Sequence, residues 1–166
     1  MRRYALEVPL NSDIMGDSVN SQNQNKIPLF ILMSSPELGK QVLKNLPIDS
    51  SSLKKILWIE RKSENIQKIP EDFYIKILAS IKLIKAFSNS EDLKREADYL
   101  ATLALDLLRK RLQKIIKIAE TNPSLDNEIL EKLSFEERII YRKICEIVGG
   151  WEKTFIKYLD GGVEWV

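Results

Sequence analysis

Residues 90–119 constrain the fold more than any other stretch of this sequence, because they contain neither glycine nor proline. Asn89 or Ser90 can cap a helix there, and apolar side chains recur at helical spacing as far as Ala119. At 1.5 Å per residue such a helix is about 45 Å long, which exceeds the width of a small domain. We therefore expect part of its length to be buried against a partner.

Further helices are predicted on both sides of the long one. The segment 69–72 starts a helix with apolar residues at helical spacing, and the segment 134–137 has the sequence of a capping box. We expect the glycine pair 149–150 to stop or kink the second of these helices, and a last short helix to cover 151–159. The buried stripe that begins after the capping box is expected to comprise Ile139, Ile140, Ile144, Ile147 and Val148.

The first part of the chain has a different pattern. It predicts a small mixed α/β domain, residues 1–62, ahead of a helical domain with a long helix, residues 63–166, so the expected fold class is mainly α. Residues 11–26 are rich in Asn, Ser and Gln, a composition typical of loops. Around this loop we predict, in chain order, strands at 4–10 and 27–33, a helix at 36–46 and a strand at 53–60.

The composition argues against an enzyme and against a membrane protein. The chain has no histidine and a single cysteine, so the commonest general base and a thiolate metal site are both missing. No phosphate-binding glycine motif is present, and we expect neither a cofactor nor a metal. We expect Cys145 in the core, and, since no apolar run approaches about 18 residues, a cytoplasmic protein without membrane contact. Carboxylates pair where helices should begin, as negative charge there is favourable: Glu71, Asp72, Glu91, Asp92, Glu136 and Glu137.

Basic and acidic residues nearly balance, at 26 and 24, so any nucleic-acid contact would need a local basic stripe. The long helix carries one, in which Lys110, Lys114 and Lys117 share a face that could neutralise phosphates. The alternative is a solvated face whose cations near the helix C-terminus are favoured by the helix dipole. No aromatic residue interleaves with these charges to stack on bases. The stripe comprises Arg109, Lys110, Arg111, Lys114 and Lys117.

Large aromatic side chains gather near the end of the sequence. Such residues are enriched where two subunits meet, because they combine a large apolar area with a polar group. Ordinary packing onto the chain's own helices is the alternative. The long helix favours a subunit contact. The set comprises Trp151, Phe155, Tyr158 and Trp165.

Three motifs of the helical half occur in an order that is similar to one known family. The segment 69–74 (IPEDFY) matches a P-E-x-F/Y helix start, and 111–115 (RLQKI) matches an R-x-x-K-I stretch. The segment 133–137 (LSFEE) then matches an L-S/T-x-E-E helix start, and Trp151 follows. Over about residues 69–159, the chain therefore resembles the helical domain of an archaeal GINS subunit.

The resemblance implies a non-enzymatic scaffold of the DNA replication fork, associated with the nucleoid. The order of domains is similar to that of the class in which the small β-rich domain precedes the helical domain. The implied partners are a sister GINS subunit in a heterotetramer, the MCM helicase, a RecJ-like replisome protein and, as a further candidate, primase. Contact with DNA would be weak or indirect.

The resemblance also suggests residues for these roles. Arg111 and Lys114 correspond to the basic stretch of the family. The alternative function is a nucleic-acid-binding accessory subunit of a primase or polymerase that uses the basic stripe directly, with steeply salt-dependent DNA binding. The positions implied for the core or for subunit contacts are Phe73, Tyr74, Leu100, Leu107, Trp151 and Phe155.

Overall fold

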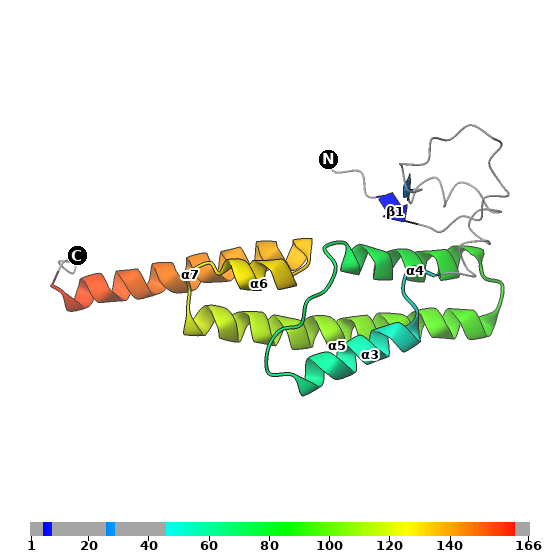
Figure 1. Cartoon of the computed structure of the whole chain (residues 1–166), viewed down its shortest axis with the longest axis horizontal. Coiled ribbons are helices and arrows are strands. Elements are labelled where there is room, and N and C mark those ends of the chain that lie inside the picture. The colour runs from blue at the N-terminus through cyan, green and yellow to red at the C-terminus, as the bar shows by residue number, and fades with distance from the viewer. Residues whose placement is uncertain (1–4, 8–25, 29–45, 162–166) are drawn as a thin grey trace. The chain divides into compact units, whose positions relative to one another are not determined.

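The computed structural model of the chain describes residues 5–7, 26–28 and 46–161, and its main elements are five helices (Figure 1). The described residues form two compact units. One contains the residues before Leu57 together with Tyr74–Leu105, and the other contains Leu57–Phe73 and the chain from Asp106 onward. In chain order the helices are α3 (Ser50–Lys62), α4 (Phe73–Phe87), α5 (Glu91–Thr121), α6 (Asn127–Lys132) and α7 (Phe135–Leu159).

The first unit contains two short strands and a helical core. Strand β1 (Ala5–Glu7) pairs antiparallel with β2 (Lys26–Pro28), and Leu6 lies opposite Ile27. Each large apolar side chain removed from water in the helical part contributes about 1.5–3 kcal/mol to its stability. The fully or nearly fully buried residues here include Leu53, Ile77, Leu83, Ile84, Ala97 and Leu100.

The second unit has its own hydrophobic cluster. Backbone hydrogen bonds join the segment before α4 to the α6–α7 region: Ile69 N donates to Lys132 O at 3.2 Å, and Phe135 N donates to Glu71 O at 3.1 Å. These bonds give partners to backbone N–H and C=O groups that would otherwise lose their hydrogen bonds to water on folding. The cluster consists of Ile66, Ile115, Ala119, Leu133, Tyr141 and Cys145, with Ile118, Ile129, Leu130 and Ile144 packed against it.

Several predictions made from the pattern are confirmed. Helix α5 has 31 residues without interruption, and α4 occupies the range expected after the segment 69–72. The capping box is present: the Glu137 N–H donates to Ser134 Oγ, and the Ser134 N–H donates to the Glu137 carboxylate. Cys145 is buried, at 4% exposure.

The strand predicted at 53–60 is wrong, because this segment lies inside helix α3. Asp49 accepts a hydrogen bond from the Ser52 N–H at 2.9 Å, and hydrogen bonding from the Ser52 side chain, together with this backbone contact, lowers the Asp49 pKa. Leu53, Leu57 and Glu60 are buried at helical spacing. The contiguous apolar run at 56–59 (ILWI) made this spacing difficult to recognise in the sequence. A short apolar run has no clear period, and tertiary contacts therefore decided its conformation.

The helix stop predicted at the glycine pair 149–150, and the separate short helix predicted at 151–159, are also wrong, since α7 is a single helix of 25 residues. A glycine inside a helix costs only about 1 kcal/mol relative to alanine, and good helix formers on both sides offset that cost. The predicted stripe was displaced as well: Ile139, Ile140 and Ile147 are exposed. The buried residues of α7 are Glu137, Tyr141 and Cys145.

Helix α6 was not predicted. It begins after Asp126, whose carboxylate accepts a hydrogen bond from the Glu128 N–H at 2.8 Å, and it has only six residues. In the N-terminal part, β1 and β2 lie within or beside the first two predicted strands. All but the last residue of the helix expected at 36–46, most of the loop at 11–26 and Trp165 lie outside the described residues. The small mixed α/β domain at 1–62 stays a prediction.

Candidate functional site

A buried ion-pair network occupies the second unit, and Arg111 of α5 is at its centre. The guanidinium binds Glu137 of α7 in a bidentate manner, with Nε–Oε1 at 2.7 Å and Nη2–Oε2 at 2.9 Å. Nη1 donates to Glu60 Oε2 of α3 at 2.8 Å. The other two N–H groups donate to the carbonyl oxygens of Gln67 and Lys132. All five donors of a fully buried guanidinium therefore have acceptors, which burial of this group requires.

Lys114, one turn further along α5, completes the network. Its ammonium donates to Glu60 Oε1 at 2.6 Å, to Glu60 O at 2.7 Å and to Asn65 O at 3.0 Å. Two buried cations thus face two buried carboxylates, and the formal charge of the cluster is zero. Since both carboxylates are fully engaged, the network joins helices and presents no free acid or base for catalysis.

This geometry changes the meaning of the predicted basic stripe. Arg111 is 0% exposed and Lys114 is 8% exposed, so neither lies on a solvated face or reaches a phosphate backbone. Arg109 and Lys117 are exposed, and Lys110 is half-buried. Only part of the stripe is therefore accessible to a polyanion. The R-x-x-K-I motif instead supplies the two cations of the buried network.

Glu60 was missed by the sequence analysis, because it was assigned to a strand. Its position at helical spacing from Leu53 and Leu57 was the available signal, since a carboxylate on an apolar helix face needs a buried cation. Glu137 was recognised only as a helix-start carboxylate. It both caps α7 and binds Arg111.

The residues suggested for the core or for subunit contacts fall into two groups. Phe73, Leu100 and Leu107 are at most 1% exposed and pack inside the chain, whereas Tyr74 is half-buried. Trp151 and Phe155 of α7 are 68% and 52% exposed, and their rings stack with centroids 5.9 Å apart. The first group therefore belongs to the core, and Trp151 and Phe155 lie on the surface of α7.

The C-terminal half of α7 has an exposed apolar face. In Figure 1 this half extends past the last turn of α5, and from Gly150 to Gly161 every residue except Glu152 is exposed. Residues at spacings of seven, four, four and three fall on the same side of a helix. We call this face the α7 row. It extends back to Ile140 near the start of the helix and comprises Ile140, Ile147, Trp151, Phe155 and Tyr158.

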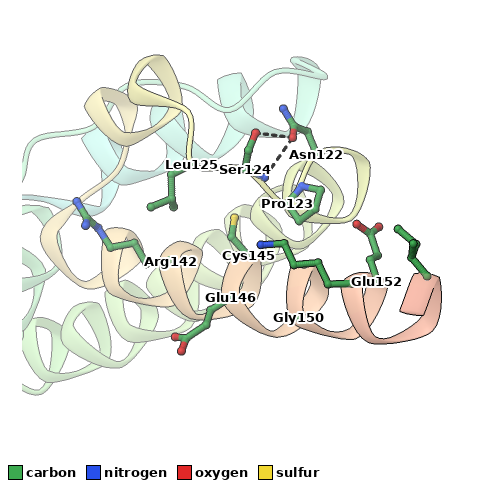
Figure 2. Close-up of a pocket in the computed structure, with 12 residues that line it drawn as sticks. Asn122, Pro123, Ser124, Leu125, Arg142, Cys145, Glu146, Gly150 and Glu152 are labelled. Carbon is green, nitrogen blue, oxygen red and sulfur yellow. Dashed lines mark hydrogen bonds between the residues drawn. The ribbon is translucent and has the colours of Figure 1, made fainter. Parts of the chain in front are cut away.

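A cavity of about 510 Å³ lies between α7 and the loop that follows α5 (Figure 2), on a side of α7 that contains no residue of the α7 row. Ser124 donates to Asn122 Oδ1 through N at 3.1 Å and through Oγ at 2.6 Å, which fixes the loop. Pro123 lies so close to Gly149 that an added Cβ would meet it at 3.4 Å. The cavity is lined by charged side chains of both signs, so its charge favours neither an anionic nor a cationic ligand. These side chains are Arg142, Glu146, Glu152 and Lys153.

The described residues contain neither a metal site nor a membrane span. No group of three His, Cys, Asp or Glu side chains there could hold a metal ion. No helix in that part of the chain combines the length and the apolar composition needed to cross a bilayer.

Comparison with known proteins agrees with the helical architecture. Residues 47–155 match the family described as the GINS complex protein helical bundle domain. The match covers α3 to most of α7, including the buried network. Comparisons with curated proteins and with solved structures gave no significant match. Since the match spans well over half of the sequence, the chain belongs to the GINS complex protein helical bundle family.

Proposed function

We propose that the chain assembles with a sister GINS subunit through the α7 row, in a complex of two plus two chains. Membership of the family establishes the general function: a GINS subunit is a non-enzymatic scaffold of DNA replication that associates with other GINS subunits at the chromosome. The proposal identifies the surface and the stoichiometry.

The observation that supports this surface is the exposure of large side chains on α7. Ile147, Trp151 and Phe155 of the α7 row are 69%, 68% and 52% exposed. A contiguous apolar surface of this kind is unfavourable in water and is rare on monomers except at interaction sites. A partner helix that covers Trp151 and Phe155 would bury roughly 150–250 Å² for each ring, enough for both to dominate the binding energy.

We further propose that the chain is an archaeal subunit of the class with the small domain first. The order of the three motifs and the position of the helical domain after residue 46 support this assignment. As partners beyond the sister subunit we propose the MCM helicase and a RecJ-like protein, with primase as a further candidate. Pull-down with each purified protein tests these contacts one at a time.

The test of assembly is the solution mass by light scattering, for the full chain alone and after co-expression with a candidate sister subunit. The double variant Trp151→Ser/Phe155→Ser should fold normally, because neither residue is buried, and should fail to form the complex. A matched control is Lys153→Ser/Lys157→Ser, which alters exposed residues of the same helix outside the α7 row and should assemble.

A two-plus-two complex for the wild type and for the control, but not for the aromatic variant, supports the proposal. A well-behaved monomer that ignores the sister subunit contradicts the assembly. Normal assembly of the aromatic variant would agree with a two-plus-two complex but would show that its interface is a surface other than the α7 row.

A further inference from the structure

We propose that the solvent face of α3 binds single-stranded nucleic acid. This surface is separate from the α7 row and from the basic stripe, and the inference does not depend on how the chain assembles. The face is defined by one continuous helix, Ser50–Lys62, so its geometry follows from the helix itself. Its members are Lys54, Lys55, Trp58, Arg61 and Lys62.

Helical spacing places an aromatic ring in the middle of four cations. Lys54, Trp58 and Arg61 stand at i, i+4 and i+7, while Lys55 and Lys62 flank them on the same side. The face covers about 12 Å along the helix axis. Trp58 is 63% exposed, so its indole ring is available for stacking. A strand would have divided these residues between two faces, and the surface therefore exists only because the segment is helical.

The charge of this face is of one sign. Glu60 is the only acidic residue of α3, and it is fully buried in the ion-pair network with Arg111. Its charge is neutralised there, so the exposed side of the helix presents four positive charges and no negative one. Such a cluster is complementary to a phosphate backbone, whose condensed counterions are released on binding.

Within the described residues, the contacts that Arg61 and Lys54 make leave the face able to bind a ligand. Arg61 Nη2 lies 3.4 Å from Asp106 Oδ2, but both side chains are at least 40% exposed, and exposed pairs of this kind are weak. Lys54 Nζ lies 4.8 Å from the centre of the Tyr99 ring, which holds the ammonium beside the helix without neutralising it. A phosphate can therefore compete for both cations.

The aromatic ring favours nucleic acid over an acidic protein segment. Every base has a flat face that stacks on indole, whatever the sequence, and a single strand leaves these faces accessible. Cations on both sides of the ring can then hold the adjacent phosphates. An acidic peptide would satisfy the lysines but would leave Trp58 without a matching flat group. We therefore assign single-stranded nucleic acid and treat acidic peptide as a competing outcome of the test.

The experiment is fluorescence anisotropy of the full chain with a labelled oligothymidylate of about 15 nucleotides, a length in the range that single-strand-binding modules cover. With up to four cations contacting phosphates, log K should fall with log salt concentration with a slope of roughly −2 to −3. Trp58→Ala should weaken binding about tenfold through lost stacking. Lys54→Gln/Lys62→Gln should reduce the magnitude of the slope by about 1.4.

Matched controls separate this face from general charge effects. Arg109→Gln/Lys117→Gln removes two exposed cations of the predicted basic stripe and should leave the affinity within about twofold, since neither lies on α3. The chain has three tryptophans, and in a Trp151→Phe/Trp165→Phe background only Trp58 remains. Its emission should then be quenched by the oligonucleotide and not by poly-glutamate.

Quenching of Trp58, together with weaker binding in the α3 variants alone, supports the inference. Three results would overturn it: no binding at low salt, equal weakening by the Arg109 and Lys117 control, or binding of poly-glutamate with the same affinity and the same dependence on Trp58. Circular dichroism of each variant checks that the helices remain intact, and Trp58→Phe, which keeps a flat ring, should retain most of the affinity.

Discussion

Removing Arg111 should destabilise the protein far more than removing any exposed arginine. The variant Arg111→Met replaces a cation that is 0% exposed and donates five hydrogen bonds to residues of α3, α6, α7 and the loop after α3. Of the two cations in the network, it leaves Lys114 alone to balance the carboxylates of Glu60 and Glu137. The cluster thus changes from neutral to a net charge of −1 in a buried site.

The magnitude follows from this uncompensated charge. Removal of one partner of a buried ion pair costs about 3–5 kcal/mol, whereas the loss of an exposed pair costs about 0–1 kcal/mol. Glu137→Gln should cost a similar amount, since Arg111 then lacks its bidentate acceptor. The double variant Arg111→Met/Glu137→Gln leaves Lys114 and Glu60 as a balanced pair. It should therefore lose less than the sum of the two single changes.

The assay is urea unfolding of the full chain at neutral pH, followed by circular dichroism. The free energy of unfolding is taken from the midpoint and the slope of the transition, and an unchanged slope shows that the native state is still compact. The matched control is Arg95→Met on the same helix, whose pair with Asp92 is largely exposed at 3.7 Å. It should change the free energy of unfolding by less than about 1 kcal/mol.

The reasoning would be refuted by a loss in Arg111→Met no larger than that in Arg95→Met. Strict additivity of the Arg111 and Glu137 changes would also contradict it, because independent contributions are incompatible with a shared buried charge.

Two further predictions concern α7. Gly150→Ala should raise the free energy of unfolding by about 0.5–1 kcal/mol, because the position is inside a continuous helix and an added Cβ meets nothing within 4 Å. Thermal unfolding measures this effect, and a lower midpoint would show that the backbone there is not helical in solution. Tyr141→Phe should cost about 0.5–1.5 kcal/mol at neutral pH, because the Tyr141 hydroxyl donates to Ser124 O at 3.3 Å. Burial raises the pKa of Tyr141, so above about pH 10 the unfolded chain loses its proton first and wild-type stability falls as the pH rises. The difference between wild type and Tyr141→Phe, measured by urea unfolding, should therefore shrink above that pH, and a constant difference would contradict the assignment.

The sequence determined the helices whose signals are local and repeated. Helix α5 follows from about thirty residues without a breaker, and the start of α7 follows from a capping box that needs only residues 134–137. The family could be inferred for the same reason, since its motifs are helix starts and a basic stretch in a fixed order. Such features need no knowledge of what packs against them.

Only the tertiary structure decided what the charged and ambiguous residues do. In the sequence, Arg111 and Lys114 look like solvent-exposed cations. Nothing in their own helix shows that Arg111 pairs with Glu60 and Glu137, which are 51 and 26 residues away from it. The segment of α3 has a short apolar run without a clear period, so burial of Leu53, Leu57 and Glu60 fixed it as a helix. That choice in turn placed Trp58 and its neighbouring cations on one face. Local patterns specify backbone periodicity, whereas burial and charge pairing depend on contacts between residues that are far apart in the chain.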